Sequence, residues 1–199
     1  MSKFLDSVRK NTLTILALTI SLFTLFMYVR QTNILVQQTK ASSWPYLVLG
    51  KSLYQSTSYS DSSLVNIDTL EIYVTNKGTG PAIIERAIVK INDEEIKVWY
   101  DLYKVVSVPD SIEITHVIRP IYQEVIMPGE KILLINWNGN PEMASYINSK
   151  IQNLEIAICY QSIHGDYWTV SRKDFVGVGD ISRIQSKDCN LNAKTYFVQ

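Results

Sequence analysis

The sequence is short of the residue types from which most active sites are built. It has two cysteines and two histidines, Cys159, Cys189, His116 and His164, and none of them stands at a C-x-x-C or H-x-x-x-H spacing. It contains no G-x-S-x-G element for a nucleophilic serine and no G-x-x-x-x-G-K-[ST] loop for a phosphate. We therefore predict no catalytic residue, no bound metal and no cofactor.

The two cysteines leave two alternatives open. If the domain that carries them is exported, Cys159 and Cys189 can form a disulfide. Such a bond would close a loop of about 30 residues and contribute roughly 3–4 kcal/mol on the chain-entropy estimate. In the other alternative Cys159 is a buried free thiol and Cys189 an exposed one.

Charge is also scarce and unevenly distributed. Charged residues make up 19% of the chain, and residues 41–199 carry 14 Lys or Arg against 18 Asp or Glu, a formal charge of −4. The absence of a Lys/Arg block argues against a nucleic-acid partner and against peripheral binding to anionic lipid. Hydrophobic residues reach 46%, which is typical of a globular protein and excludes a disordered chain.

One long stretch has no charge at all. Residues 11–29 are rich in Leu, Ile and Phe, and a helix of about 18–19 residues spans roughly 27–28 Å, close to the thickness of a bilayer's hydrocarbon core. We predict a transmembrane helix here. A cleaved signal peptide is disfavoured because residues 26–30 (FMYVR) offer no small-residue cleavage site. A buried core helix is disfavoured because the segment has no charged face.

The basic residues that flank this helix predict its orientation. Lys3, Arg9 and Lys10 precede it, whereas Arg30 and Lys40 follow it. The positive-inside rule then places residues 1–10 in the cytoplasm and the large domain outside, in the periplasm or the extracellular space. Four residues are predicted to anchor the helix at the membrane interfaces: Arg9, Lys10, Tyr28 and Arg30.

Residues 30–43 are predicted to extend the helix as a stalk. They contain no Gly or Pro, and Ile34, Leu35 and Val36 offer a short seam for self-association. The Trp44-Pro45 pair then ends the helix, because proline disfavours the helical conformation of the residue before it.

Residues 44–199 are predicted to form one β-rich domain. One inserted helix is expected at about 141–152, since Asn140 is a suitable N-cap and Pro141 fits the first helical position. Many short strands with frequent turns between them indicate an antiparallel, immunoglobulin-like β-sandwich. The expected strands are 46–53, 69–74, 82–91, 96–100, 114–118, 122–126, 131–137, 154–160 and 167–172.

Two motifs of this domain resemble one family. The segment 72–82 (IYVTNKGTGPA) is similar to the N-x-G-x-G-P-A strand–turn–strand element of uncharacterised bacterial single-pass membrane proteins, and residues 158–168 resemble their late hairpin. Those proteins also place one helix before a W/R-P-Y strand, as residues 44–46 do here. Their hairpin often carries extra cysteines where this chain has Gln161 and Tyr167. The resemblance implies the architecture and brings no activity with it.

Three aromatic residues are the remaining candidate for a binding site. Trp99, Tyr100 and Tyr103 lie close together in the least regular part of the sequence, and aromatic loops favour contacts with proteins or carbohydrates. The alternative is that Trp99 fills the core. Two other segments are better explained as turns than as ligand sites, the acidic run 93–95 and the glycine-containing run 77–81.

The sequence therefore predicts a membrane-anchored, non-enzymatic interaction or sensor module whose β-sandwich binds a protein partner. The alternative is an accessory subunit of a larger membrane complex, for transport, secretion or defence. A hydrolase assembled from residues distant in sequence is a third hypothesis. The expected partners are the lipid bilayer and a protein, or another copy of this chain, with no nucleic acid and no small-molecule substrate.

Overall fold

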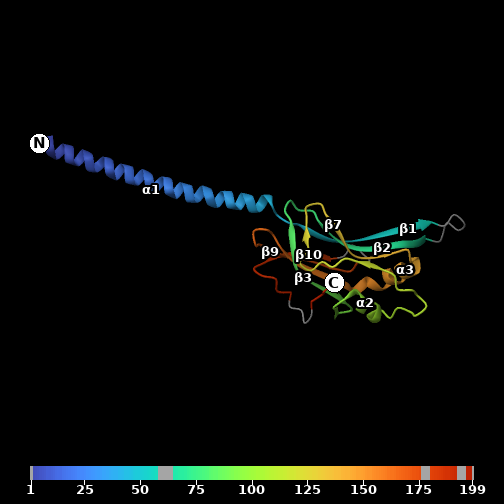
Figure 1. The fold of residues 1–199 in the computed structure, drawn as a ribbon. Helices are drawn as coiled ribbons and strands as arrows, with labels where there is room; N and C mark the ends of the chain where they lie inside the picture. The colour runs from blue at the N-terminus through green and yellow to red at the C-terminus, as the bar shows by residue number, and fades with distance from the viewer. Residues whose placement is uncertain (1, 58–64, 176–179, 192–195, 199) are drawn as a thin grey trace. The chain divides into compact units, whose positions relative to one another are not determined.

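The fold class predicted from the sequence is confirmed: the chain is mainly β, with antiparallel sheets that follow a long apolar helix (Figure 1). The structure, a computed structural model, describes residues 2–57, 65–175, 180–191 and 196–198, with the backbone alone for residues 2–10, 57, 65 and 66. Two compact units make up the chain, Met1–Ser42 and Ser43–Gln199. Each is described by itself.

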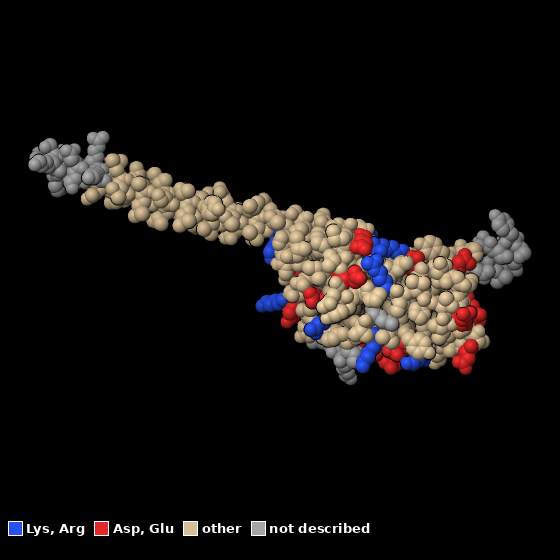
Figure 2. All heavy atoms as spheres, viewed as in Figure 1, with Lys and Arg blue, Asp and Glu red and all other residues tan. Residues whose placement is uncertain are grey.

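The first unit is one continuous helix, α1 (Ser2–Ser42), so the membrane segment and the stalk share a single element. Its hydroxyl side chains bond to carbonyls of the preceding turn, as Ser21 does to Ala17 at 2.8 Å and Thr24 to Ile20 at 2.8 Å. The segment Asn11–Ser42 is long and apolar enough to cross a membrane, and none of its most apolar part is buried inside the chain. Figure 2 shows its long uncharged surface.

The first sheet of the second unit has the strand order β1-β2-β7-β5. β1 and β2 form a long hairpin, and β7 pairs with β2 on its other side. β7 is apolar along most of its length, and its Ile132, Leu134, Ile135 and Trp137 are buried while Lys131 and Asn138 are exposed. The burial passes from even to odd positions at Leu134, where the pairing with β2 is irregular. The strands are β1 (Leu47–Thr57), β2 (Val65–Asn76), β5 (Val117–Ile118) and β7 (Lys131–Asn138).

The second sheet has the order β10-β9-β8-β3-β4, and β6 pairs with β3 beside β4. Its central strands are nearly all apolar because they lie between other strands and cover the core. The predicted bounds of β3 are those observed, and β10 is a strand beyond those expected from the sequence. The strands are β3 (Ala82–Ile91), β4 (Glu94–Ile96), β6 (Val125–Ile126), β8 (Leu154–Gln161), β9 (Tyr167–Lys173) and β10 (Asp180–Ser186).

Two helices are inserted in the domain, where the sequence predicted one. α3 (Pro141–Lys150) begins as expected, because the side chain of Asn140 accepts a hydrogen bond from the amide of Met143 at 3.0 Å; a 3-10 turn, η1 (Ile151–Asn153), follows it. The second helix, α2 (Trp99–Val105), stands where a strand was predicted to end. Apolar residues at 99, 102, 103 and 106 follow the helical period, and all four are buried.

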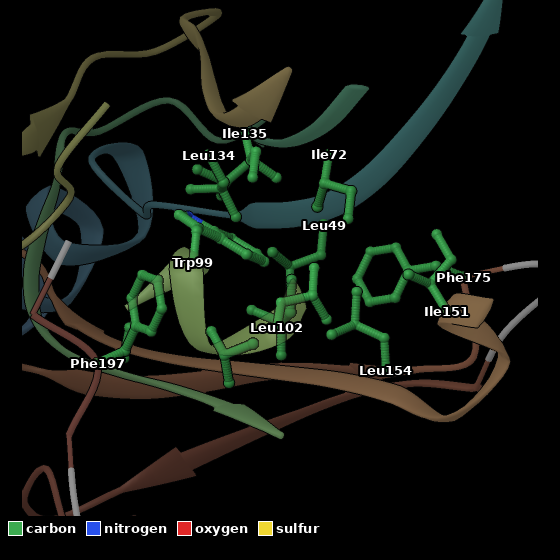
Figure 3. Close-up of a cluster of buried hydrophobic side chains, with 14 of the residues drawn as sticks. Leu49, Ile72, Trp99, Leu102, Leu134, Ile135, Ile151, Leu154, Phe175 and Phe197 are labelled. Carbon is green, nitrogen blue, oxygen red and sulfur yellow. The ribbon is translucent and has the colours of Figure 1, made fainter. Parts of the chain in front are cut away.

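Side chains from both sheets and from α2 fill one core (Figure 3). Trp99 of α2 is fully enclosed and its ring meets that of Phe197 edge to face, with 5.1 Å between the ring centroids. Tyr103 is buried beside it, and its hydroxyl accepts a hydrogen bond from the indole N–H of Trp137 at 3.1 Å. The polar tips of the buried aromatics thus have partners inside the domain.

The end of the described chain completes the second sheet. The amide of Phe197 donates to the carbonyl of Ala87 in β3 at 2.9 Å, between the parts of β3 that pair with β6 and with β4. Arg86 donates to the hydroxyl of Tyr196 at 2.7 Å and its guanidinium lies 4.5 Å from the centre of that ring. The tail is therefore a structural part of the domain.

Replacement of Phe197 by alanine tests this role of the tail. Phe197→Ala should lower the free energy of unfolding by about 3 kcal/mol, because it leaves a cavity against Trp99. The measurement is urea unfolding of the full chain in detergent micelles, followed by tryptophan fluorescence. The matched control is Val198→Ala at the neighbouring exposed residue, for which the expected change is less than about 0.5 kcal/mol. Equal effects of the two substitutions would contradict the role given to Phe197.

Candidate functional site at the start of the β domain

A buried asparagine organises the first residues of the domain. Asn76 ends β2 and is fully enclosed. Its side-chain oxygen accepts hydrogen bonds from the amides of Tyr46 at 3.1 Å and Gly78 at 2.9 Å. Its NH₂ group donates to the carbonyls of Gly80 at 2.8 Å and Ile126 at 2.9 Å. Both lone pairs and both N–H bonds of the amide are used, so this polar side chain is fully satisfied.

The turn after Asn76 holds the same residues by its backbone. The amide of Lys77 donates to the carbonyl of Tyr46 at 2.7 Å, and the amides of Thr79 and Gly80 donate to the carbonyl of Trp44 at 2.9 and 3.3 Å. These amides are bonded inside the domain, which agrees with a connecting turn and leaves no anion cradle. We call residues 43–47 together with residues 76–80 the junction.

Two glycines allow the two parts of the junction to approach so closely. A Cβ at Gly78 would lie below 3.0 Å from backbone atoms of Trp44 and Tyr46, and a Cβ at Gly80 would meet the carbonyl of Ser43 in the same way. Backbone atoms cannot turn aside as a flexible side chain can. The N-x-G-x-G pattern therefore combines one asparagine that binds residues 44–46 with two glycines that leave space for them.

Side chains from the second sheet hold the junction from the other side. The Nε of Arg183 in β10 donates to the carbonyl of Leu47 at 3.0 Å, and its guanidinium lies 4.0 Å from the centre of the Tyr46 ring. Trp44 meets Tyr46 edge to face at 5.3 Å. The amide of Leu47 donates to the hydroxyl of Tyr160 at 3.5 Å. Burial raises the pKa of Tyr160, against the smaller opposing effects of Leu47 and Arg183, so this phenol stays neutral.

The turn between β8 and β9 adds a contact to the first residue of the domain. Nε2 of His164 lies 2.8 Å from Oγ of Ser43, and the His164 amide donates to the hydroxyl of Ser162 at 3.1 Å. The contact joins the first residue of the domain to the turn between β8 and β9.

The predicted aromatic patch of Trp99, Tyr100 and Tyr103 is wrong. Trp99 and Tyr103 are 1% and 3% exposed, whereas Tyr100 is 54% exposed. The reason is that these residues form α2, whose helical period turns positions 99, 102 and 103 inward and position 100 outward. The alternative that Trp99 fills the core describes the observed structure.

The cysteines and His116 have structural surroundings. A disulfide joins Cys159 and Cys189, with 5.8 Å between their Cα atoms, so these sulfurs are not free to bind a metal. Within the described residues no group of three His, Cys, Asp or Glu side chains could hold a metal ion. The ring of His116 lies 5.3 Å from that of Tyr103, and burial lowers the pKa of this histidine, which keeps it neutral at pH 7.

The predicted interface anchors are resolved in part. Tyr28 is exposed, and the guanidinium of Arg30 lies 5.6 Å from the centre of the Phe26 ring one turn earlier. The side chains of Arg9 and Lys10 lie outside the described residues.

In the acidic run 93–95, Glu95 forms an ion pair with Lys90 at 3.4 Å.

Comparison with known proteins adds one likeness. No family model matches the chain, and no curated protein matches it. Among solved structures the chain is similar to a protein of the archaeal flagellum of Methanospirillum hungatei strain JF1, with 14% identity, a TM-score of 0.35, and coverage of 87% of this chain and 95% of that chain.

Replacement of Asn76 tests the centre of the junction. Asn76→Ala should lower the free energy of unfolding by about 3 kcal/mol, because it leaves two part-buried amides and two buried carbonyls without this partner. Asn138→Ala is the control, since this exposed asparagine only accepts one hydrogen bond from Thr69; its effect should be about 0.5 kcal/mol or less. Urea unfolding of the full chain in micelles measures both changes. A loss below about 1 kcal/mol for Asn76→Ala would contradict the stabilising role given to the Asn76 side chain.

A substitution at Gly80 tests the close approach of the two backbones. Gly80→Ala should push residues 43–45 away from the turn and expose the peptide bond after Lys77 to trypsin, which therefore cuts there several times faster. Thr79→Ala, at an exposed neighbour in the same turn, should leave the rate unchanged. Limited proteolysis followed by mass spectrometry gives both rates. Equal rates for the two variants would show that the glycine is not needed for space.

Proposed function

We propose that this chain is a membrane-anchored, non-enzymatic binding module: α1 crosses the bilayer once and the β domain binds a protein partner. The observation that carries the proposal is the surface of α1. Large apolar side chains lie all around the helix, and those of its described residues are exposed. Only lipid or the helices of other proteins can take such a surface out of water.

The disulfide supports the predicted orientation, with residues 1–10 in the cytoplasm and the β domain outside. Disulfides persist in oxidising compartments and are rare in the cytoplasm. The bond joins Cys159, on a central strand, to Cys189, beyond the last strand, so it holds the tail on the second sheet. An exported domain is where this fastening would form and last.

The strand order supports an immunoglobulin-like topology. In such domains the strands A, B, E and D form one sheet and C, F and G the other. Here β1-β2-β7-β5 has the same sequence of neighbours as A-B-E-D, and β3-β8-β9 the same as C-F-G. The likeness of residues 72–82 to the bacterial single-pass membrane proteins points to the same architecture.

The surface of the domain favours a protein partner over a small substrate. Five exposed large apolar side chains come from the single segment 114–127: Ile114, Val117, Tyr122, Val125 and Met127. Exposed apolar side chains that follow closely in one segment favour contact with a protein. By contrast, the cavity at the end of β3 and the start of β8 is lined by polar and charged side chains, unlike the mostly apolar pockets that bind small molecules.

Selective labelling of reporter cysteines tests the proposal. The chain should remain in carbonate-washed membranes, and Ser111→Cys, at an exposed site of the domain, should react in intact cells with a maleimide that cannot cross the membrane. Cys159→Ala and Cys189→Ser remove the native thiols in both reporter chains.

The opposite reporter is Ser2→Cys. It should be labelled only after lysis, because residues 1–10 are proposed to be cytoplasmic. The reverse pattern would overturn the orientation. Release of the chain by carbonate would overturn the membrane anchor itself.

A further inference from the structure

β1 is an edge strand over its whole length. It has eleven residues, and among the described strands it pairs with β2 alone (Figure 1). An edge strand presents a row of backbone N–H and C=O groups that can pair with another chain, and natural domains cover such rows or place charges and prolines on them. The two halves of β1 differ in this respect.

The first half of the edge is covered. Arg183 donates to the carbonyl of Leu47 at 3.0 Å, and Arg172 donates to the carbonyl of Leu49 at 3.1 Å. Since backbone groups alternate between the two sides of an antiparallel strand, these bonds show that the odd-numbered residues of β1 turn their backbone away from β2. The next residues to do so are Lys51, Leu53 and Gln55.

The second half carries no protecting residue of its own, since residues 52–57 (SLYQST) include no charge, no proline and no glycine. Its register with β2 shifts between Tyr54 and Gln55, where the extra residue belongs to β2, so the alternation along β1 continues. Lys51, at the start of this half, donates to the side chain of Asn148 in α3 at 3.1 Å. The long edge of the other sheet differs, because β10 carries both Asp180 and Arg183. The second half of β1 is thus the part of the domain best suited to accept a strand.

We propose that a second copy of this chain pairs antiparallel with this half of β1, with Leu53 opposite Leu53 of the second copy. The inference names a partner for the binding module proposed above and a surface other than segment 114–127, and it rests on that function. The pairing would extend the first sheet across two molecules, as in other cases of strand addition.

The residues of this half are complementary to themselves in that register. Leu53 turns its backbone outward in both copies, so about six backbone hydrogen bonds can form through residues 51, 53 and 55. Lys51 then faces Gln55 of the second copy, and no like charges meet. Ser52 faces Tyr54 of the second copy, and the small serine leaves room for this exposed ring. A symmetric contact of this kind closes as a dimer.

Cysteine cross-linking in membranes tests the register. Leu53→Cys in the full chain, with the native disulfide intact, should give a disulfide-linked dimer under mild oxidation, because directly opposed residues place their Cα atoms about 5.5 Å apart, within the range of a disulfide. Ser111→Cys should give no such dimer. A failure to cross-link at 53, or equal cross-linking at 111, would overturn the inference.

Two substitutions of Gln55, one to a positive and one to a negative residue, test the same contact and leave Leu53 unchanged. Gln55→Lys places two like charges opposite Lys51 and should weaken the dimer about tenfold, whereas Gln55→Glu places opposite charges there and should preserve or strengthen it. Sedimentation of the full chain in micelles gives the dimer fractions. Equal fractions for the two variants would overturn the pairing.

The two proposals fail in different ways. If the domain is labelled from outside and the chain stays in washed membranes but does not cross-link at residue 53, the dimer inference is wrong and the proposed function stands. If carbonate releases the chain from membranes, the proposed function is wrong, whether or not residue 53 cross-links.

Discussion

The hydrogen bonds of the Asn76 side chain fix how the domain begins. One amide group joins the start of β1, the turn after β2 and the end of β6, three segments that are far apart in sequence. The cost of enclosing such a polar group is offset only because all four of its hydrogen-bonding positions are filled. Gly78, Gly80 and Arg183 then have clear roles, since each lets the backbone of residues 43–47 stay where Asn76 holds it.

Much of the fold follows from patterns that the sequence displays locally. The apolar run of β7 and the cap of α3 by Asn140 depend on neighbouring residues, so both could be predicted. The helix over residues 99–105 is harder to predict. The tryptophan and the two tyrosines in this segment favour strands, and the helical spacing of its apolar residues extends over barely two turns. Burial of three side chains on one side decided the outcome there.

The junction could be predicted only in part. The glycines of residues 76–81 indicated a turn, but what they make room for, the backbone of residues 43–46, follows from tertiary structure alone. His164, Arg183 and Tyr160 lie 121, 136 and 113 residues from their partners at the start of the domain, and no local signal joins them. The binding role proposed for the domain likewise rests on which apolar side chains remain exposed, and the sequence alone does not show this.

The position of Phe197 has a consequence for biosynthesis. This residue is made after every other side chain of the core that it enters, and the disulfide needs Cys189, which is also made late. The apolar helix α1 and the strands β1 to β10 all precede Phe197 in the sequence. The first core residues are therefore made before the side chains that enclose them, and the core can close only once Cys189 and Phe197 have been made.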